Sequence, residues 1–335
     1  MKTPSQKTWN ALALTTFFAF CLSISSANAA HDNGKIQMAI TVDDLPDHAE
    51  LPRGWSFNRI KDGFISAFEK HNIKGVYGFV NSAVIKNDQP ELIHILEDWR
   101  AAGHKLGNHT FSHPDYATTT FEDYTKNILD NEEILGKLAP PSEYKFFRFP
   151  FLSEGNTLEK FNSLRDFLHA HQYTVAPITT DFQDWRWNDV FPKCTLHGTR
   201  SELQWLKDQY LARAKEDISR AESDMTFRFN RPVKHVLLMH FGAFDAMMID
   251  QLLSQYEQMG IEFISLEDAL TDPIYRDDGP PALPGTLRSL SERELQKDPT
   301  LTDTPLDQKT DQEEKDEDLK FQKMCKGGLR SIFRR

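Results

Sequence analysis

Short apolar runs alternate along the chain with longer segments in which apolar residues recur every three or four positions. Runs of the first kind are typical of buried strands, and the second spacing is typical of helices that bury one face. The strand-like runs, in chain order, read QMAITVDD, KGVYGFV, HKLGNHT, KFFRFPF, QYTVAPIT, HVLLMHF and IEFISL. The helices predicted between them cover Arg59–His71, Glu91–Ala102, Phe121–Lys137, Thr157–His171, Ser201–Ser223 and Ala246–Met259.

This alternation predicts an α/β fold, because parallel strands are joined by crossover connections that are usually helical. Seven strand candidates are one fewer than a full barrel contains. We therefore expect a distorted, incomplete seven-stranded (β/α) barrel. With 39% hydrophobic residues and 24 phenylalanines, the chain can fill one substantial core, which favours a single large domain.

Polar residues capable of catalysis stand at or shortly after the carboxyl ends of these runs. In barrels of this type, the loops at the carboxyl ends of the strands build the active site. Five separate segments that end in such residues favour an enzyme over a purely structural protein. The residues are Asp43, Asp44, His109, Arg148, Asp184 and His240.

The N-terminus resembles a secretory leader. A basic head, MKTPSQK, precedes the apolar stretch ALALTTFFAFCLSISS and the A-x-A sequence that ends at Ala29. The apolar stretch is shorter than the roughly 20 residues that a membrane span needs. We expect residues 1–29 to be a signal peptide and the protein to be exported, either to the periplasm or outside the cell. The alternative is an uncleaved N-terminal anchor.

The mature chain is expected to be acidic. The leader holds Lys2 and Lys7 and no acids, so its removal changes the formal charge from −11 to −13. Such a chain repels nucleic-acid phosphates, and no other segment is long and apolar enough to span a membrane. The sequence does not indicate an oligomeric state. Two cysteines remain, Cys194 and Cys325, and whether they pair is left open.

The composition changes after about residue 276. Prolines cluster in DDGPPALPG, and the following run KDPTLTDTPLDQKTDQEEKDED is almost free of apolar residues. A segment of that composition cannot bury enough surface to offset its ordering entropy. We expect residues 277–335 to be a disordered charged tail and residues 30–276 to form the catalytic domain.

Two histidines in the segment GNHTFSHPD are candidate metal ligands. His109 and His113 would present their imidazoles on one side if the segment turned helically, and one carboxylate would complete a catalytic set with an open position. Asp43 and Asp44 are candidates for that carboxylate. Because neighbouring residues in a strand face opposite sides, one acid could reach a metal while the other points to the substrate. The alternatives are surface or capping histidines and a turn that ends the strand.

Taken in order, the motifs resemble the polysaccharide deacetylase family, the NodB-homology carbohydrate esterases, across most of Ile36–Leu270. Members of this family hydrolyse N- or O-acetyl groups on glycans. The five matching elements are Thr41-Val42-Asp43-Asp44, His109-Thr110-Phe111-Ser112-His113, Arg148-Phe149-Pro150-Phe151, Asp181-Phe182-Gln183-Asp184-Trp185 and Leu238-Met239-His240.

The resemblance implies a role for each matching residue. Asp44, His109 and His113 would bind a divalent metal, with zinc expected, and Asp43 would act as the general base. Arg148 would position Asp43, and the backbone N–H of Phe151 would stabilise the oxyanion. His240 would protonate the leaving group while Asp184 orients its imidazole. Trp185 and Leu238 would form the pocket for the acetyl methyl group, although ordinary core packing explains these two residues equally well.

Two of the chain's departures from the family pattern bear on the substrate. Leu45 replaces the usual glycine after the two acids, and Arg186–His235 forms a long, largely helical and charged insertion. The insertion could wall one side of the cleft. Both features bear on the substrate more than on the reaction. We read nine other histidines as structural or surface residues, with His48 the one closest to the expected cleft.

Three functions fit the sequence. The first is an exported, metal-dependent deacetylase of an acetylated glycan. The second is a metal-dependent hydrolase of small non-peptide C–N bonds, such as cyclic amides, on the same fold. The third is a glycan-binding protein that has lost turnover. The presence of Asp43, Arg148 and His240 favours catalysis, because binding alone needs none of them.

Overall fold

The computed structural model describes residues 35–275, 319–321 and 323–325. The chain divides into Met1–Gly34 and Lys35–Arg335, and every described residue belongs to the second unit. The predicted signal peptide lies outside the described residues. Most of the predicted tail does so as well.

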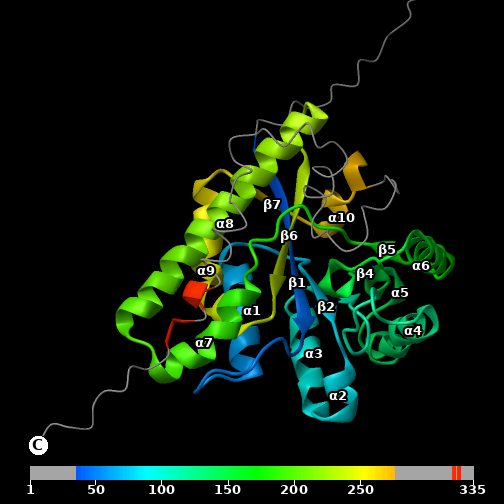
Figure 1. The fold of residues 1–335 in the computed structure, drawn as a ribbon, viewed down its shortest axis with the longest axis horizontal. Helices are drawn as coiled ribbons and strands as arrows, with labels where there is room; N and C mark the ends of the chain where they lie inside the picture. The colour runs from blue at the N-terminus through cyan, green and yellow to red at the C-terminus, as the bar shows by residue number, and fades with distance from the viewer. Residues whose placement is uncertain (1–34, 276–318, 322, 326–335) are drawn as a thin grey trace, which may run out of the picture. The chain divides into compact units, whose positions relative to one another are not determined.

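The described residues contain one sheet of seven parallel strands (Figure 1). Its order is β5-β4-β3-β2-β1-β6, and β7 pairs with the first residues of β1. This curled parallel sheet confirms the predicted seven-stranded, incomplete (β/α) barrel. The strands are β1 (Gln37–Leu45), β2 (Tyr77–Val80), β3 (Lys105–Asn108), β4 (Phe146–Phe147), β5 (Thr174–Val175), β6 (Lys234–His240) and β7 (Glu262–Ile264).

Strand β1 is the centre of the sheet, since it pairs with three other strands. It is buried along almost its whole length, which explains why its sequence is nearly continuously apolar before the two acids. Its pairing with β6 sets Asp43 opposite His240. Beyond β5, Thr180 forms a single parallel bridge with Leu237, so the chain after β5 also reaches β6.

The six predicted helices are all present, with boundaries shifted by a few residues. Four of the long helices begin where a side-chain hydroxyl accepts a hydrogen bond from the helix backbone, at Ser56, Thr120, Thr157 and Thr199. The helices are α1 (Phe57–Lys70), α2 (Ala83–Asn87), α3 (Ile93–Ala101), α4 (Phe121–Leu138), α5 (Pro141–Tyr144), α6 (Leu158–Ala170), α7 (Trp185–His197), α8 (Arg200–Phe229), α9 (Ala243–Gln258) and α10 (Leu266–Ala269), with 3-10 turns η1 (Pro90–Leu92), η2 (Pro150–Leu152) and η3 (Pro273–Tyr275).

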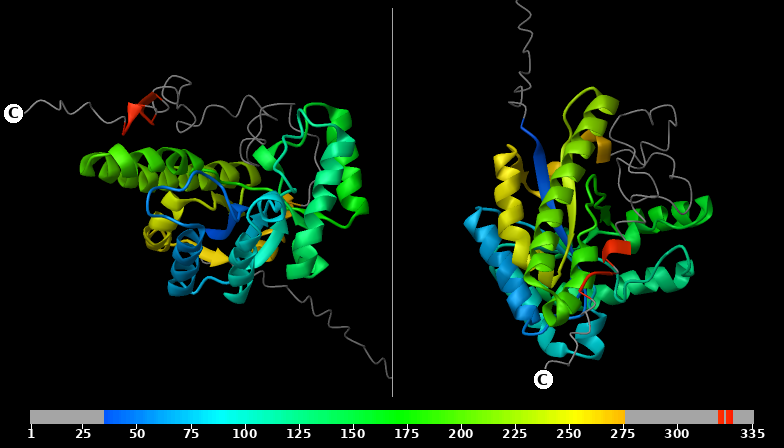
Figure 2. Two further views of the ribbon diagram at one scale, coloured as in Figure 1. Left: turned by 90° about the horizontal axis from the view of Figure 1, so that it is seen from below. Right: turned by 60° about the vertical axis from the view of Figure 1, so that its left-hand side comes forward.

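The helices flank the sheet on two sides. Helices α4 and α6 lie on one flank, and α7, α8 and α9 lie together on the other (Figures 1 and 2). Aromatic rings fill much of the core between helices and sheet; Phe64, Trp99 and Phe241 meet with ring centroids about 6 Å apart. No helix among the described residues is both long and apolar enough to cross a membrane.

A short piece of the predicted tail is attached to the insertion helices. Cys325 forms a disulfide with Cys194 of α7, and Phe321 packs edge-on against Trp187 with ring centroids 5.0 Å apart. Phe321 and Cys325 are buried. The prediction of a disordered tail is therefore wrong for residues 319–321 and 323–325. The reason is local: Phe321, Met324 and Cys325 bury their side chains, and a covalent link joins this segment to the domain.

Candidate active site

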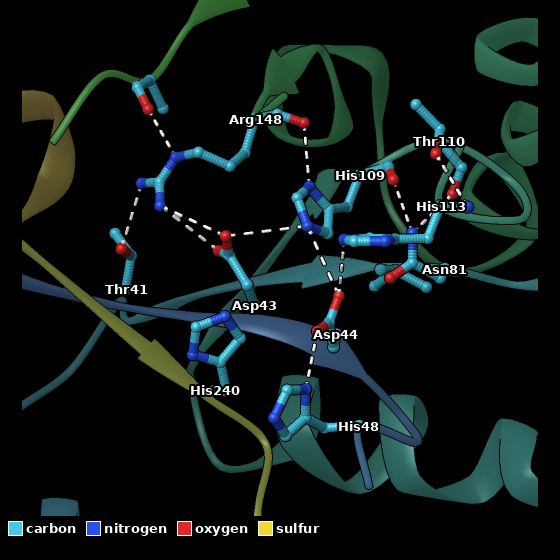
Figure 3. Close-up of polar contacts among 12 residues, drawn as sticks. Thr41, Asp43, Asp44, His48, Asn81, His109, Thr110, His113, Arg148 and His240 are labelled. Carbon is cyan, nitrogen blue, oxygen red and sulfur yellow. Dashed lines mark hydrogen bonds and ion pairs between the residues drawn. The ribbon is translucent and has the colours of Figure 1, made fainter. Parts of the chain in front are cut away.

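The predicted site residues come together at the carboxyl ends of the strands, as expected (Figure 3). Asp43 and Asp44 end β1, and His240 ends the neighbouring strand β6. His109 directly follows β3 and Arg148 directly follows β4. Five separate segments thus supply one cluster, in which Asp184 stands just before α7.

The two acids of β1 face the same imidazole. Asp43 Oδ2 and Asp44 Oδ1 lie 3.7 and 3.4 Å from His109 Nε2. We expected neighbouring acids to point to opposite sides of the strand, and that expectation was wrong. Asp44 adopts a left-handed backbone conformation (φ 64°), and the pairing of β1 with β2 shifts register between Val42 and Leu45. This irregularity interrupts the alternation of side chains and brings both carboxylates to one place.

The two histidines reach Asp44 from a shaped loop and not from a helix. Thr110 and His113 have positive φ (68° and 56°). The segment therefore does not form the helical turn that the sequence analysis considered. The side chain of Asn81 donates hydrogen bonds to the backbone carbonyls of His109 and Thr110 and so holds the loop. His109 Nε2 and His113 Nε2 lie 3.4 and 3.5 Å from Asp44 Oδ1.

These three side chains fit a divalent metal. Ligands held about 2.0–2.2 Å from a tetrahedral zinc are roughly 3.3–3.5 Å apart, which matches the two nitrogen–oxygen distances to Asp44. Among the described residues, Asp44 Oδ1 is buried without a hydrogen bond. His109 Nδ1 lies 2.8 Å from the backbone oxygen of Arg148, so Nδ1 carries the hydrogen of that bond, and in the neutral ring Nε2 keeps its lone pair for a ligand.

The ionisation of Asp44 and His113 also suits a cation. Burial opposes the charge of Asp44, but contacts with His109 and His48 hold its pKa well below the ordinary value. Burial and the neighbouring His109 lower the pKa of His113 to about 4, so its ring is neutral at neutral pH. An ionised carboxylate and a neutral imidazole are the forms that bind metals.

Asp43 is held from behind by a buried arginine. Arg148 Nη1 donates to both carboxylate oxygens of Asp43 at 3.3 and 3.4 Å, and its Nη2 donates to Thr41 Oγ1 at 3.1 Å. The guanidinium also lies over the ring of Phe79, 4.7 Å from its centroid. Arg148 is 1% exposed, so this geometry leaves the arginine little freedom. The pair gives Asp43 a fixed orientation beside Asp44, His109 and His113.

His240 is held by Asp184. The backbone N–H of His240 donates to Asp184 Oδ2 at 2.6 Å, and His240 Nδ1 lies 2.8 Å from Asp184 Oδ1. Burial raises the pKa of Asp184 to about 6, and burial together with the charge of His48 lowers the pKa of His240 to about 4. Because Nδ1 is engaged, the Nε2 atom of His240 is the one left for chemistry.

His48 is part of the site, although sequence reasoning did not select it. Its Nδ1 lies 2.7 Å from Asp44 Oδ2, and its ring lies 4.6 Å from that of His240 (Figure 3). Burial opposes the charge of His48, but Asp44 raises its pKa to about 9. Asp44, His48 and His240 form a second group whose ligand atoms are close enough to share an ion. The signal in the sequence was the spacing of four residues after Asp44.

Part of the chain matches a known protein family. Residues 30–167 match the model of the polysaccharide deacetylase family. This segment contains both acids of β1, both loop histidines, and Arg148 with Phe151. Over these residues the chain matches the polysaccharide deacetylase family. The predicted resemblance is confirmed.

Two curated relatives are bacterial. The chain is 25% identical over 186 residues to a peptidoglycan-N-acetylglucosamine deacetylase of Bacillus cereus, covering 56% of this chain and 57% of the relative. It is 40% identical over 88 residues to a peptidoglycan-N-acetylmuramic acid deacetylase of Bacillus subtilis, covering 26% of this chain and 31% of the relative. The matches thus span about half and about a third of these relatives' lengths.

Among solved structures, the chain is similar to a CE4 family pseudoenzyme of Bacillus anthracis, with 15% identity, a TM-score of 0.49, and 71% and 66% of the two chains covered. It is also similar to the peptidoglycan deacetylase PdaC of Bacillus subtilis, with 17% identity, a TM-score of 0.45, and 71% and 93% covered. The sheet topology described above, and not these similarities, establishes the fold.

Three residues carry family roles that the geometry does not test. Phe151 lies in η2 with φ 56°, and its exposed ring (64%) stands 4.4 Å from that of His113. Trp185 begins α7 and is 38% exposed. Leu238 is buried with Phe79 and Ile178 in the inner core of the barrel. The oxyanion role of Phe151 and the acetyl pocket formed by Trp185 and Leu238 remain predictions.

Proposed function

We propose that this chain is an exported hydrolase of the polysaccharide deacetylase family that depends on a divalent metal, with zinc expected, and removes acetyl groups from a glycan. One observation carries the proposal. Asp44, His109 and His113 converge at ligand spacing, while an unligated acid, Asp43, and a second imidazole, His240, lie beside them on paired strands.

Asp44, His109 and His113 would hold the metal. A divalent cation bound there would supply Lewis acidity, which activates water and polarises the acetyl carbonyl. Asp43, fixed by Arg148, accepts the proton of the attacking water. The backbone N–H of Phe151 stabilises the oxyanion that develops on the carbonyl oxygen.

His240 donates a proton to the leaving nitrogen or oxygen through Nε2. The hydrogen bond between Nδ1 and Asp184 keeps the ring oriented and leaves Nε2 for the proton transfer. Burial lowers the pKa of His240 to about 4, so the ring gives up its proton readily once it is protonated. Asp43 on β1 and His240 on the paired end of β6 can therefore act on the same acetyl group. Asp43 takes a proton from the attacking water, and His240 gives one to the leaving group.

A peptidoglycan strand is the first substrate to test. Both curated relatives are named as peptidoglycan deacetylases, one for N-acetylglucosamine and one for N-acetylmuramic acid. The exposed ring of Phe151 beside the metal cluster offers an apolar surface for a sugar. The N-terminal leader sequence and the disulfide Cys194–Cys325 support export, because disulfides persist in oxidising compartments.

Acetate release by the purified mature protein tests the proposal. Peptidoglycan, chito-oligosaccharides and acetylated xylan would be compared with small cyclic amides as substrates. We expect acetate from at least one glycan, loss of activity with a chelator, and recovery on adding zinc. Asp43→Asn should lower kcat by about 10²–10⁴-fold, because it removes the base, whereas the exposed Asp88→Asn should not.

Two outcomes would contradict the proposal. Opening of a cyclic amide without acetate release from any glycan would favour hydrolysis of small C–N bonds. Binding of a glycan by the metal-loaded protein without turnover would favour a binding protein.

A further inference from the structure

A second buried carboxylate lies behind the Asp184–His240 pair. Asp245 is the third residue of α9, and its side chain is hydrogen-bonded to that of Asp184. Asp184 and Asp245 are both fully buried. Two carboxylates in contact in a buried site cannot both be ionised without a large repulsion, so the pair holds a proton.

The surroundings indicate which of the two acids keeps that proton. Asp184 receives two hydrogen bonds from His240, one from the backbone N–H and one from Nδ1. These donors stabilise the ionised form of Asp184. Burial and the neighbouring Asp184 raise the pKa of Asp245 well above its ordinary value. Asp245 is therefore the protonated member.

Asp245 also receives two hydrogen bonds, but both come from neutral side chains, whereas Asp184 faces the titratable ring of His240. Tyr210 Oη donates to Asp245 Oδ1 at 2.6 Å, and Asn188 Nδ2 donates to Asp245 Oδ2 at 2.5 Å. The oxygen of the Asn188 side chain in turn accepts from the backbone N–H of Phe244 at 2.9 Å, which fixes the amide orientation. The other titratable groups that interact with this pair are His48, on the loop after β1, and Tyr256 of α9, which interacts with Asp184.

We propose that Asp245 is a positioning residue for His240: it stays protonated, donates its hydrogen bond to Asp184, and so fixes Asp184 as the ionised acceptor of the His240 Nδ1–H. This inference rests on the proposed function, in which His240 is the acid. It also assigns the insertion Arg186–His235 a role, which is to hold Asp245. Asn188 of α7 and Tyr210 of α8 come from that insertion and hold Asp245 in place.

Infrared spectroscopy of the wild type and of Asp245→Asn tests where the proton lies. We expect the carbonyl band of a protonated carboxylic acid at neutral pH in the wild type and its loss in Asp245→Asn. Asp272→Asn is the matched control, because Asp272 is also buried but is ionised against Arg231. An unchanged band in Asp245→Asn would overturn the inference.

Kinetics on the metal-loaded full chain test the positioning role. In Asp245→Asn the amide nitrogen can replace the acid as donor to Asp184, and the Tyr210 hydroxyl can rotate to accept. We expect kcat within about threefold of the wild type in Asp245→Asn. In Asp245→Ala we expect a loss of about tenfold to a hundredfold in kcat with KM unchanged, since only the protonation step is impaired.

Equal kcat in Asp245→Ala and the wild type would overturn the inference. If the wild type releases no acetate from any glycan, the proposed function fails, and the infrared comparison still decides whether Asp245 carries the proton. The same comparison decides the question if Asp245→Ala does not fold.

Discussion

The backbone of Asp44 determines which side chains can share a metal. A left-handed conformation (φ 64°) at an acid is tolerated because aspartate can bond locally, whereas a β-branched residue would be strained there. With regular strand geometry, Asp43 and Asp44 would point to opposite faces. The observed turn instead places both acids within 4 Å of His109 Nε2.

His48 should matter for metal affinity without being essential for the fold of the site. His48 Nδ1 lies 2.7 Å from Asp44 Oδ2. Residues that hydrogen-bond a metal ligand in this way typically change the metal affinity by about 10–100-fold. We expect His48→Ala to weaken zinc binding by about that factor in a competition titration with a chelator. His94→Ala, an exposed residue bonded to Glu97, is the control. Equal affinities would show that His48 does not orient Asp44.

His104 should make the fold sensitive to acid. It precedes β3, and its ring packs against Phe68 and Trp99 at 5.1 and 5.0 Å. Burial, then the charge of Lys74, lowers its pKa from 6.5 to about 4. Between these two pH values the unfolded chain binds a proton that the folded chain does not. The stability that His104 contributes is therefore complete above pH 6.5 and is lost as the pH falls to about 4.

Urea unfolding at several pH values measures this effect. We expect the wild type to lose on the order of 2–3 kcal/mol more than His104→Leu between neutral pH and pH 4, at about 1.4 kcal/mol per pKa unit. The exposed His169→Leu should follow the wild type. A pH dependence that is the same in His104→Leu and the wild type would refute the assignment.

The sequence was most informative for residues that lie within motifs. Asp44, His109 and Arg148 could be selected because each follows a strand and belongs to a recognisable element. His48 and Asp245 could not be selected in this way. Their roles depend on a turn after β1 and on contacts between α7, α8 and α9, and neither the turn conformation nor those contacts leave a local pattern in the sequence.

At the scale of elements, the turn between β6 and α9 joins the site to the insertion. A side-chain carbon at Gly242 would lie 2.0 Å from atoms of the Asn188 side chain, so only glycine leaves room there. Asn188 uses that space to bond Phe244 and Asp245. The docking of α7 on α9 therefore depends on a close approach that a methyl group would prevent.

Two glycine substitutions distinguish the effect of this contact on stability from the effect of helix propensity. Gly242→Ala should lower the free energy of unfolding by about 1–3 kcal/mol, because Asn188 must move and its hydrogen bonds are disturbed. Gly136→Ala is the matched control: it lies in α4 with open space around it and should raise the free energy by about 0.5–1 kcal/mol. Urea denaturation measures both values. A Gly242→Ala protein as stable as the wild type would contradict the described packing.

The long elements were predictable because their burial pattern repeats over many residues. Helices α4 and α6 began within one residue of their predicted starts, each at a threonine cap. Helices α2, α5 and α10 were missed, since four or five residues are too few to show a helical period. Helix α7 was predicted only as part of a largely helical insertion and not as a separate helix. The fifth strand is shorter than predicted and covers only Thr174–Val175. After it, the chain no longer pairs with β4 and instead meets β6 at Thr180.

At the scale of the molecule, the disulfide joins residues that are 131 positions apart. The sequence left this pairing open, because two distant cysteines do not define a connectivity. In the structure, the segment before Cys325 adds its own contacts. Lys320 Nζ lies 3.9 Å from the ring centroid of Trp205, and the backbone N–H of Cys325 donates to Glu202 at 3.1 Å.

Removing the disulfide should therefore destabilise the domain. We expect the double variant Cys194→Ser/Cys325→Ser to lose about 2–5 kcal/mol in free energy of unfolding, as is typical for a bond that closes a long loop. Urea unfolding with and without a reductant gives the comparison. The reductant should lower the stability of the wild type and leave the double variant unchanged. A wild type insensitive to reduction would contradict the bond or its contribution.

The central claim is that Asp44, His109 and His113 share one divalent metal. Metal analysis of the purified protein after dialysis against zinc, with Asp44→Ala and the control His71→Ala measured in parallel, tests it most directly. We expect about one zinc per chain in the wild type and the control, and a loss of that zinc in Asp44→Ala. A wild type that retains no divalent metal, or an Asp44→Ala protein that retains as much as the wild type, would contradict the account.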